Sequence, residues 1–257
     1  MNWEQYIFEG KPFEGIYIFD VHGHVGAHKP FQLGGYDADS VAKTCRRMNV
    51  DGVVVSSLPA LASDWKWGNE EVAASVDAYP GLIWGYASPN PFYEDCDITP
   101  YLDLPGFVGV KIHGDMQGST PVNDPRYFPT YEVANERGLP VLFHAWLSAE
   151  VRAAADVARR YPNTKIILGH SGMTARDTAL EVARTCDNIF IDTAISSTYD
   201  NAIEVLVDKV GADRVVYGSD ICFFDCIHTM GKIALARISD TDKEKIFGLN
   251  ARGLFSL

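Results

Sequence analysis

Two histidines separated by one residue, His22 and His24, follow a short apolar run near the start of the chain. Side chains two positions apart on an extended backbone point the same way, so both imidazoles can face one metal ion. Gly23 lies between them and allows the backbone to bend close to that ion. The same pattern also occurs as two solvent-facing loop histidines, so it predicts a metal site only together with other residues.

Further side chains that can bind metal recur where later apolar runs end. The chain has seven histidines, and five of them lie at such ends: His22, His24, His113, His144 and His170. Asp220 follows the last run, in the segment Tyr-Gly-Ser-Asp. Neutral imidazole and carboxylate groups are ligands that suit Zn²⁺. The pattern therefore predicts one metal site built from residues far apart in the sequence.

The apolar runs predict eight β-strands, at residues 16–20, 52–56, 82–86, 107–112, 140–143, 165–168, 188–192 and 214–217. The runs are continuously apolar, as in a parallel sheet buried on both faces. Helical patterns lie between them, at 40–48, 70–78, 131–137, 149–160, 174–185, 201–210 and 243–249. Strands that alternate with helices predict an α/β fold, a single (β/α)8 TIM barrel over residues 1–257. An open doubly wound sheet is the competing fold.

The predicted barrel explains how the polar residues could meet. The carboxyl ends of all its strands lie at one rim, where enzymes of this fold keep their active sites. We therefore expect the metal site at the C-terminal ends of the strands. Three segments that follow strands, residues 23–37, 58–68 and 114–125, are rich in Gly, Pro, Trp and Phe. We expect them to be irregular loops that cover the substrate.

The bulk composition limits the partners of the chain. Its 257 residues are 47% hydrophobic, which is enough for one large core. The formal net charge of −12 argues against binding to nucleic acid or to an anionic membrane surface. No transmembrane helix and no signal peptide is expected. Five cysteines are an odd and sparse set that fits reduced thiols in the cytoplasm. The expected partner is a small-molecule substrate.

The motifs together resemble the amidohydrolase superfamily, specifically its amidohydrolase-related group of compact metal-dependent hydrolases. The matching segments are Asp20-Val-His22-Gly-His24, Gly109-Val-Lys111-Ile-His113, Pro140-Val-Leu-Phe-His144, Leu168-Gly-His170-Ser-Gly172 and Val216-Tyr-Gly-Ser-Asp220. Gln117 and the closing segment 245–255 also match, so the resemblance covers residues 16–255. One departure is Gly114, where the family often has a proline.

The resemblance implies that His22, His24, His144 and Asp220 hold the metal. The expected ion is Zn²⁺, one per chain, with Mn²⁺ as an alternative. Such an ion lowers the pKa of a bound water toward about 7, and Asp220 would take the proton of that water as general base. His170 would polarise the scissile carbonyl or protonate the leaving group. The expected activity is hydrolysis of an amide, lactone or ester bond in a small molecule.

The roles of other rim residues stay open. In some superfamily members a lysine at the end of the fourth strand is carboxylated and bridges two metal ions. Lys111 would then bridge, with His144 and His170 serving the second ion; otherwise Lys111 is an ammonium that faces a substrate carboxylate. Residues expected to contact the substrate or to orient the ligands are His113, Trp146 and Asp192. Asp20 is expected to have a minor orienting role at most.

Two other functions would use the same residues. Relatives in this group include metal-dependent decarboxylases and hydratases of aromatic or unsaturated carboxylic acids, and fold and metal do not fix the reaction. The short chain slightly favours hydrolysis, whereas release of CO₂ without net addition of water would identify a decarboxylase. A non-catalytic metal-binding or ligand-binding barrel would lack a ligand, but Asp220 and His170 are both present. The resemblance also weakly implies a homo-oligomer.

Overall fold

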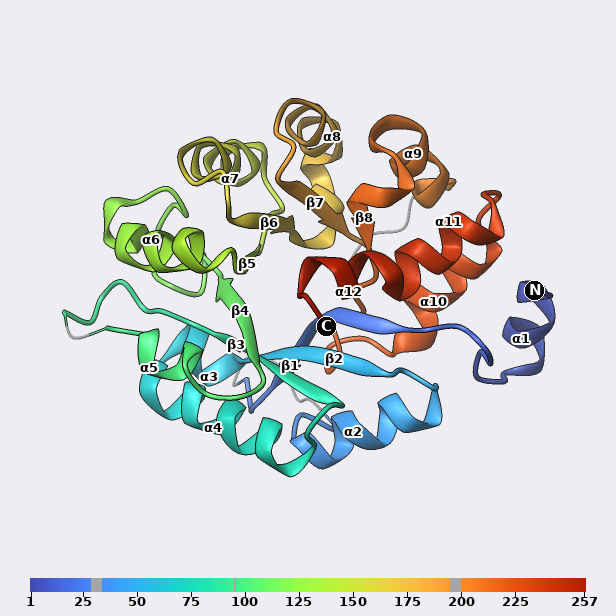
Figure 1. Ribbon diagram of the computed structural model, residues 1–257, viewed down its shortest axis with the longest axis horizontal. Coiled ribbons are helices and arrows are strands. Elements are labelled where there is room, and N and C mark those ends of the chain that lie inside the picture. Colours follow the sequence, from blue (N-terminus) through green and yellow to red (C-terminus); the bar gives the residue numbers. More distant parts are fainter. Residues whose placement is uncertain (29–33, 95, 195–199) are drawn as a thin grey trace.

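A computed structural model describes residues 1–28, 34–94, 96–194 and 200–257. Within these ranges, eight parallel strands form one sheet in which each strand pairs with the next along the chain. The strands are β1 (Phe19–Val25), β2 (Gly52–Ser57), β3 (Ile83–Ala87), β4 (Phe107–Ile112), β5 (Pro140–Phe143), β6 (Lys165–Leu168), β7 (Ile189–Asp192) and β8 (Val215–Val216). Figure 1 shows the strands surrounded by helices, so the predicted (β/α)8 barrel is confirmed.

The helices form the outer layer of the barrel (Figure 1). They are α1 (Trp3–Glu9), α2 (Ala38–Arg47), α3 (Leu58–Ala62), α4 (Trp65–Ala78), α5 (Thr99–Leu102), α6 (Phe128–Arg137), α7 (Ser148–Arg160), α8 (Arg176–Thr185), α9 (Ala202–Val210), α10 (Cys226–Leu235), α11 (Asp240–Glu244) and α12 (Asn250–Leu254). Further helical turns are η1 (Pro125–Tyr127), η2 (Gly169–Ala175) and η3 (Ala212–Arg214), which are of the 3-10 type, and η4 (Lys245–Leu249), which is π-helical. Among the described residues, no helix has both the length and the apolar character required to cross a membrane.

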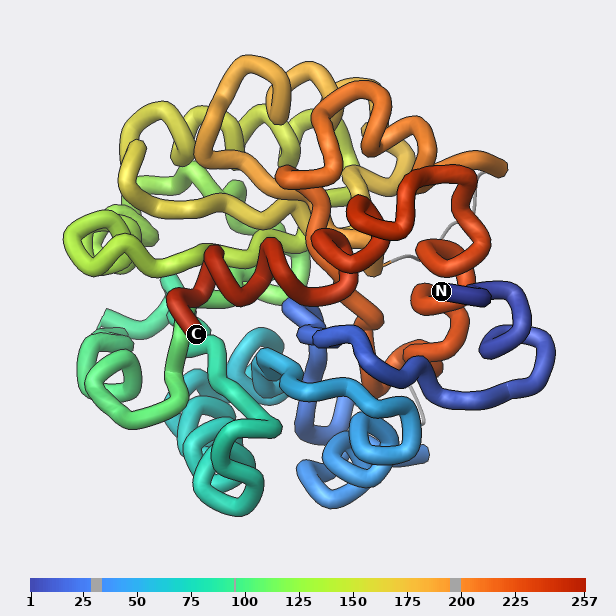
Figure 2. Tube along the Cα trace, turned by 45° about the vertical axis from the view of Figure 1, so that its right-hand side comes forward, coloured from blue at the N-terminus to red at the C-terminus, as the bar shows by residue number. Residues whose placement is uncertain are grey.

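The C-terminal helix closes one end of the barrel. Leu254 and Phe255 pack into the interior cluster that contains Phe19 and Val21 of β1. The ring of Phe255 lies 5.8 Å from that of Phe19, between ring centroids. Figure 2 shows the C-terminal segment crossing the middle of the molecule. Since Phe19 begins β1, α12 plugs the N-terminal end of the barrel and leaves the opposite rim to the predicted site.

Closure between β8 and β1, here called the β1–β8 seam, depends on a few hydrogen bonds near that rim. The N–H of Val21 donates to the carbonyl of Tyr217 at 2.9 Å, and the N–H of Asp220 donates to the carbonyl of His22 at 2.8 Å. Gly23 and Ile221 form an isolated parallel bridge. Because β8 itself has two residues, the residues that follow it complete the seam.

The first strand differs from the sequence expectation. It was predicted at residues 16–20, with the histidines after it, but β1 runs from Phe19 to Val25. Its second half continues to pair with β2, where His24 stands opposite Ser56. The register shifts between Asp20 and Gly23, a bulge that re-aims side chains. His22 and His24 are therefore strand residues.

The expectation of an irregular segment at residues 58–68 is wrong. It contains α3 and the start of α4, because the side chain of Ser57 caps Ala60 and that of Asp64 caps Trp67. The expected loop at 114–125 is irregular until η1 begins at its last residue. Residues 29–33 of the first expected loop lie outside the described residues.

Candidate metal centre

Three predicted ligands from opposite ends of the chain meet at the rim. One ligand atom each of His22, His24 and Asp220 lies within 4.8 Å of the others. The Nε2 atoms of His22 and His24 lie 3.6 and 3.2 Å from the same Asp220 oxygen, Oδ1. All three residues are buried. The expectation that both histidines of the motif face one point is therefore met, and the β1–β8 seam supplies the whole group.

Asp192, at the end of β7, orients His22. Its Oδ2 lies 2.6 Å from His22 Nδ1, and both side chains are fully buried. This contact places the proton on Nδ1 and leaves the Nε2 lone pair directed at Asp220. The other oxygen of Asp192 accepts the N–H groups of His170, at 2.7 Å, and Ala194, at 3.1 Å. Asp192 therefore lies where its expected orienting role requires.

Ser56 of β2 orients the second histidine, and the sequence analysis missed it. Its Oγ lies 3.0 Å from Nδ1 of His24, and both groups are buried. The hydroxyl leaves Nε2 of His24 facing Asp220. The signal in the sequence was a polar residue at the end of an apolar strand. Serine is so common at such ends that this signal alone is weak.

Two glycines make room for His22. A Cβ atom on Gly218 would come within 2.9 Å of the Cβ of His22. A Cβ atom on Gly169 would meet the carbonyl oxygen of Phe143 at 2.7 Å and Cε1 of His22 at 3.3 Å. These separations are too short for a larger residue unless the backbone moves. The tight packing fixes the ring of His22 against β6 and the residues after β8.

His144, the fourth predicted ligand, lies in a neighbouring aromatic group. Its Nδ1 is 3.1 Å from His170 Nε2. Its ring stacks on His113, with centroids 3.8 Å apart, and lies 4.8 Å from the ring of Trp146. Among the described residues, the compact ligand group includes His22, His24 and Asp220 but not His144. Rim residues expected to contact substrate thus lie together beside the centre.

His170 begins a turn of unusual backbone geometry. The φ angles of His170, Ser171, Gly172 and Met173 are 62°, 53°, 73° and 43°. Left-handed angles at residues other than glycine are strained and persist where surrounding contacts enforce them. Here the N–H of His170 and the hydroxyl of Ser171 both bond to Asp192. One aspartate therefore fixes both His22 and the turn that carries His170.

Lys111 of β4 is fully buried beside the ligands. Its Nζ lies 3.0 Å from Nε2 of His22, the atom that faces Asp220. Burial lowers the pKa of Lys111 to about 8, while the carboxylates of Asp220 and Asp192 favour its charged form. This position suits either an ammonium that faces a substrate anion or a modified lysine at a second ion.

The electrostatics of the centre suit a metal ion. Burial lowers the pKa values of His22 and His24, and it lowers the pKa of His170 to about 4. These imidazoles are therefore neutral near pH 7, as metal ligation requires. Two neutral imidazoles and a carboxylate form a donor set that fits a divalent transition metal and leaves coordination positions open.

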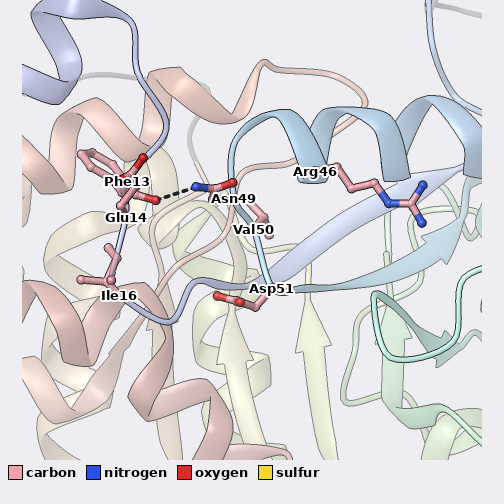
Figure 3. Close-up of a pocket in the computed structure, with 8 residues that line it drawn as sticks. Phe13, Glu14, Ile16, Arg46, Asn49, Val50 and Asp51 are labelled. Atoms are coloured by element: carbon pink, nitrogen blue, oxygen red, sulfur yellow. Dashed lines mark hydrogen bonds between the residues drawn. The ribbon is translucent and has the colours of Figure 1, made fainter.

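A separate hollow of about 430 Å³ lies at the other end of the barrel, between the N-terminal segment and α2 (Figure 3). Its polar residues serve the backbone. Asn49 donates to the carbonyl of Phe13 at 3.0 Å, and Asp51 accepts the N–H of Ile18 at 2.7 Å. The hollow therefore contributes to the packing of the chain start, and the chemistry gathers at the opposite rim.

Comparison with known proteins identifies relatives over most of the chain. A model of the amidohydrolase family matches residues 20–257. The sequence is 22% identical to 2-amino-3-carboxymuconate-6-semialdehyde decarboxylase of Dictyostelium discoideum, across 84% of this chain and 76% of that protein. It is also 22% identical to gamma-resorcylate decarboxylase of Polaromonas sp., across 74% of this chain and 75% of that protein.

Solved structures share the barrel. A 2,6-dihydroxybenzoate decarboxylase complexed with 2,6-dihydroxybenzoate gives a TM-score of 0.77 at 18% identity, covering 95% of this chain and 100% of that one. A dihydroxybenzoic acid decarboxylase from Polaromonas sp. JS666, with bound manganese and 2-nitroresorcinol, gives 0.76 at 16% identity, covering 95% and 98%. The 4-oxalomesaconate hydratase of Rhodopseudomonas palustris gives 0.69 at 19% identity, covering 93% and 95%.

These proteins overturn the expectation of hydrolysis. The two sequence relatives named above are decarboxylases, and the three structures named above are two decarboxylases and a hydratase, which agrees with the stated alternative. The expectation failed because histidine and carboxylate ligands serve several reactions, so the ligand set does not distinguish them. Chain length, which had favoured hydrolysis, gives no information about the bond that is broken.

Proposed function

Because the chain belongs to the amidohydrolase family, we propose that it is a metal-dependent decarboxylase of a small aromatic or unsaturated carboxylic acid. The observation that carries the proposal is the convergence of His22, His24 and Asp220 within 4.8 Å. The relatives that match most of this chain are decarboxylases, which directs that centre toward carboxylic acid substrates.

One divalent ion, Mn²⁺ or Zn²⁺, is assigned to this centre. Held there, it would act as a Lewis acid toward a carboxylate or hydroxyl oxygen of the substrate. His22, His24 and Asp220 would be its ligands. His144 is the proposed fourth ligand through Nε2, because its Nδ1 faces His170 at 3.1 Å. Bound manganese in a similar barrel supports Mn²⁺ as the first ion to test.

Decarboxylation breaks the bond between a substrate carbon and its carboxylate and places a proton on that carbon. Asp220 is assigned as the residue that carries this proton, since its carboxylate faces the point where His22 and His24 converge. His170 would orient the substrate by a hydrogen bond, because burial keeps its imidazole neutral, with a pKa of about 4. Lys111 would balance negative charge on the substrate.

Aromatic side chains beside the centre suit a planar substrate. The ring of Trp146 lies 4.8 Å from His144, and the ring of Phe223 lies 5.5 Å from His24. Flat apolar surfaces next to a few polar groups are typical of sites for small unsaturated molecules. The substrate class is therefore proposed as hydroxybenzoates or unsaturated acids of similar size.

The test is an assay of metal-loaded protein with 2,6-dihydroxybenzoate, related hydroxybenzoates and unsaturated carboxylic acids. We expect release of CO₂ in equal amount to a product that lacks one carboxylate, with no net addition of water. The Asp220→Asn variant should lose this activity by about 10²-fold or more, because it removes a proposed metal ligand and the proposed proton carrier, and proton transfer by a positioned group alone contributes that much. Addition of water without CO₂ release would replace the proposal with a hydratase.

A further inference from the structure

A second carboxylate, that of Asp20, lies just behind the metal centre and is fully buried. Its Oδ1 accepts two backbone N–H groups, from His22 and from Ser219, each at 3.0 Å. Its Oδ2 accepts the hydroxyl of Ser219. Asp20 and Ser219 are 199 positions apart in the chain. One side chain therefore joins the backbone next to a β1 ligand to the segment that follows β8.

The partner of Asp20 extends this connection around Asp220. The hydroxyl oxygen of Ser219 accepts the N–H of Ile221 at 3.0 Å. Asp220 itself donates its N–H to the carbonyl of His22 at 2.8 Å. Its φ angle of 63° lies in the left-handed region, which a non-glycine residue adopts at a cost. Bonds on both sides of Asp220 thus enforce a conformation that it would otherwise avoid.

The position of these bonds matters because the sheet has its shortest ladders on the two sides of β8. Every strand pair from β1·β2 to β6·β7 has a ladder of at least three paired residues. β7 and β8 pair through two residues. Between β8 and β1, the described residues form one isolated bridge, of Gly23 with Ile221, together with the backbone hydrogen bonds of the seam. A buried carboxylate costs free energy unless it is hydrogen-bonded. Asp20 satisfies its oxygens with groups that flank the ligands.

From these contacts we propose that Asp20 is a positioning residue of the metal centre. Its carboxylate, through Ser219, clamps the β1–β8 seam and holds His22 and Asp220 at the separation that one ion requires. The inference rests on the proposed metal centre. It replaces the minor orienting role expected from the sequence, because the bulge in β1 directs Asp20 toward the residues after β8.

The test measures metal binding by folded protein, apart from activity. Asp20→Ala and Ser219→Ala remove the clamp, and Asp20→Asn keeps an oxygen that can accept both backbone N–H groups. Ser57→Ala is the matched control, since it removes a hydroxyl that donates to Glu71 at 2.7 Å on the same rim. The dissociation constant for Zn²⁺ is measured by competition with a chromophoric chelator. The visible spectrum of bound Co²⁺ reports the ligand geometry.

We expect Asp20→Ala and Ser219→Ala to weaken Zn²⁺ binding about 10–100-fold, as loss of ligand-orienting groups does, and to change the Co²⁺ spectrum. Asp20→Asn should keep most of the Zn²⁺ affinity and a Co²⁺ spectrum close to that of the wild type. Ser57→Ala should keep the wild-type affinity and spectrum while it lowers the melting temperature. If Asp20→Ala does not fold, the Zn²⁺ affinity and the Co²⁺ spectrum of the milder variant Ser219→Ala test the inference. Folded clamp variants with wild-type affinity and spectrum would overturn the inference. No metal uptake by the wild type would overturn the metal centre and this inference with it.

Discussion

The two imidazoles of the centre are oriented by partners of different strength. His22 contacts the buried carboxylate of Asp192 at 2.6 Å, whereas His24 contacts the hydroxyl of Ser56 at 3.0 Å. A carboxylate partner fixes the ring and increases the basicity of the ligating nitrogen more than a neutral hydroxyl does. His22 should therefore depend more on its partner than His24.

This difference predicts unequal effects of substitution. Asp192→Asn should weaken binding of Mn²⁺ or Zn²⁺ about 10–100-fold, because it removes the charge behind His22 and disturbs the turn at His170. Ser56→Ala should have a smaller effect. Titration calorimetry on both variants measures their dissociation constants for the metal, and so the two losses of affinity. Equal losses would show that the carboxylate adds nothing beyond a hydrogen bond.

Substitution of Lys111 should change the metal affinity in the opposite direction. A buried ammonium 3.0 Å from the ligating atom of His22 repels a dication, so Lys111→Met should tighten metal binding while it impairs turnover of a carboxylate substrate. Elemental analysis should give one ion per chain in the wild type and in the variant. Two ions in the wild type and one in Lys111→Met would instead indicate a carboxylated lysine that bridges them.

Some residues of the centre could be recognised from the sequence by their type and position, and others could not. His22, His24 and Asp220 were predictable because metal-binding types stood at strand ends that a barrel brings together. His144 was predicted at the same rim, but its stacking on His113 was not, since the direction of a side chain just after β5 depends on its neighbours. Ser56 and Ser219 carried no distinctive signal, because serine satisfies backbone groups throughout proteins.

At the scale of elements, strands were predicted well where pairing and apolar composition coincide. The predicted bounds of β4, β5 and β6 match those observed. β1 extends past its apolar run because backbone pairing with β2 continues through His24, whatever its side chain. The sequence analysis assigned no helix at α1, α3, α5 or α10. Helix α3 forms inside an expected irregular segment because the side chain of Ser57 caps its first turn.

The contact between β1 and the residues after β8 gives a prediction for Gly218. A Cβ atom there would lie 2.9 Å from the Cβ of His22, so Gly218→Ala should destabilise the protein by about 1–3 kcal/mol and weaken metal binding. Gly253→Ala in α12 is the control, because its Cβ atom would meet nothing within 4 Å. Urea denaturation should show a neutral or stabilising effect for the control. Similar losses in both variants would contradict the steric explanation.

The contact between α10 and the residue that follows β7 predicts an effect of pH on stability. Lys232 of α10 lies 3.4 Å from the carbonyl of Thr193, and burial lowers its pKa from 10.5 to about 8, with Asp192 opposing the shift. Between these values the unfolded chain holds a proton that the folded chain has lost, so this group makes the unfolding free energy rise with pH. Lys232→Met should remove that rise and increase stability at pH 7.

Denaturation of wild type and Lys232→Met between pH 7 and pH 10.5 measures the difference. Lys209→Met is the control, because the Lys209 side chain is 53% exposed and its charge stays in water. A difference between wild type and Lys232→Met that does not change over this interval would show that the amine keeps its proton in the folded state.

At the scale of the whole molecule, the metal centre and the closure of the barrel are one structure. The fold was predictable because eight apolar strands alternate with helices, and this pattern has few solutions. The structure of the seam was not predictable from the sequence. It depends on the two-residue length of β8 and on hydrogen bonds between residues 199 positions apart. An ion held by His22, His24 and Asp220 would link the first strand to the residues after the last.

Metal removal should therefore lower the stability of the barrel as a whole and of the seam in particular. At a free metal concentration of 100 times the dissociation constant, binding to the folded state alone stabilises it by about 2.7 kcal/mol. For a domain of this size, that corresponds to an increase in melting temperature of about 5–11 °C. Scanning calorimetry with Zn²⁺ or Mn²⁺ and with a chelator measures the shift.

Hydrogen exchange separates the local effect from the global one. The amides of Val21, His24 and Asp220 bond across the seam, whereas the amide of Gly85 bonds to the carbonyl of Gly106 between β3 and β4, away from the proposed ligands. If the ion bridges β1 and the residues after β8, metal should slow exchange at the three seam amides more than at Gly85, because local opening of the seam then requires release of the ion. Equal protection at all four amides would mean that the seam opens only when the whole barrel unfolds, and the ligands would then be held together by the fold and not by the ion.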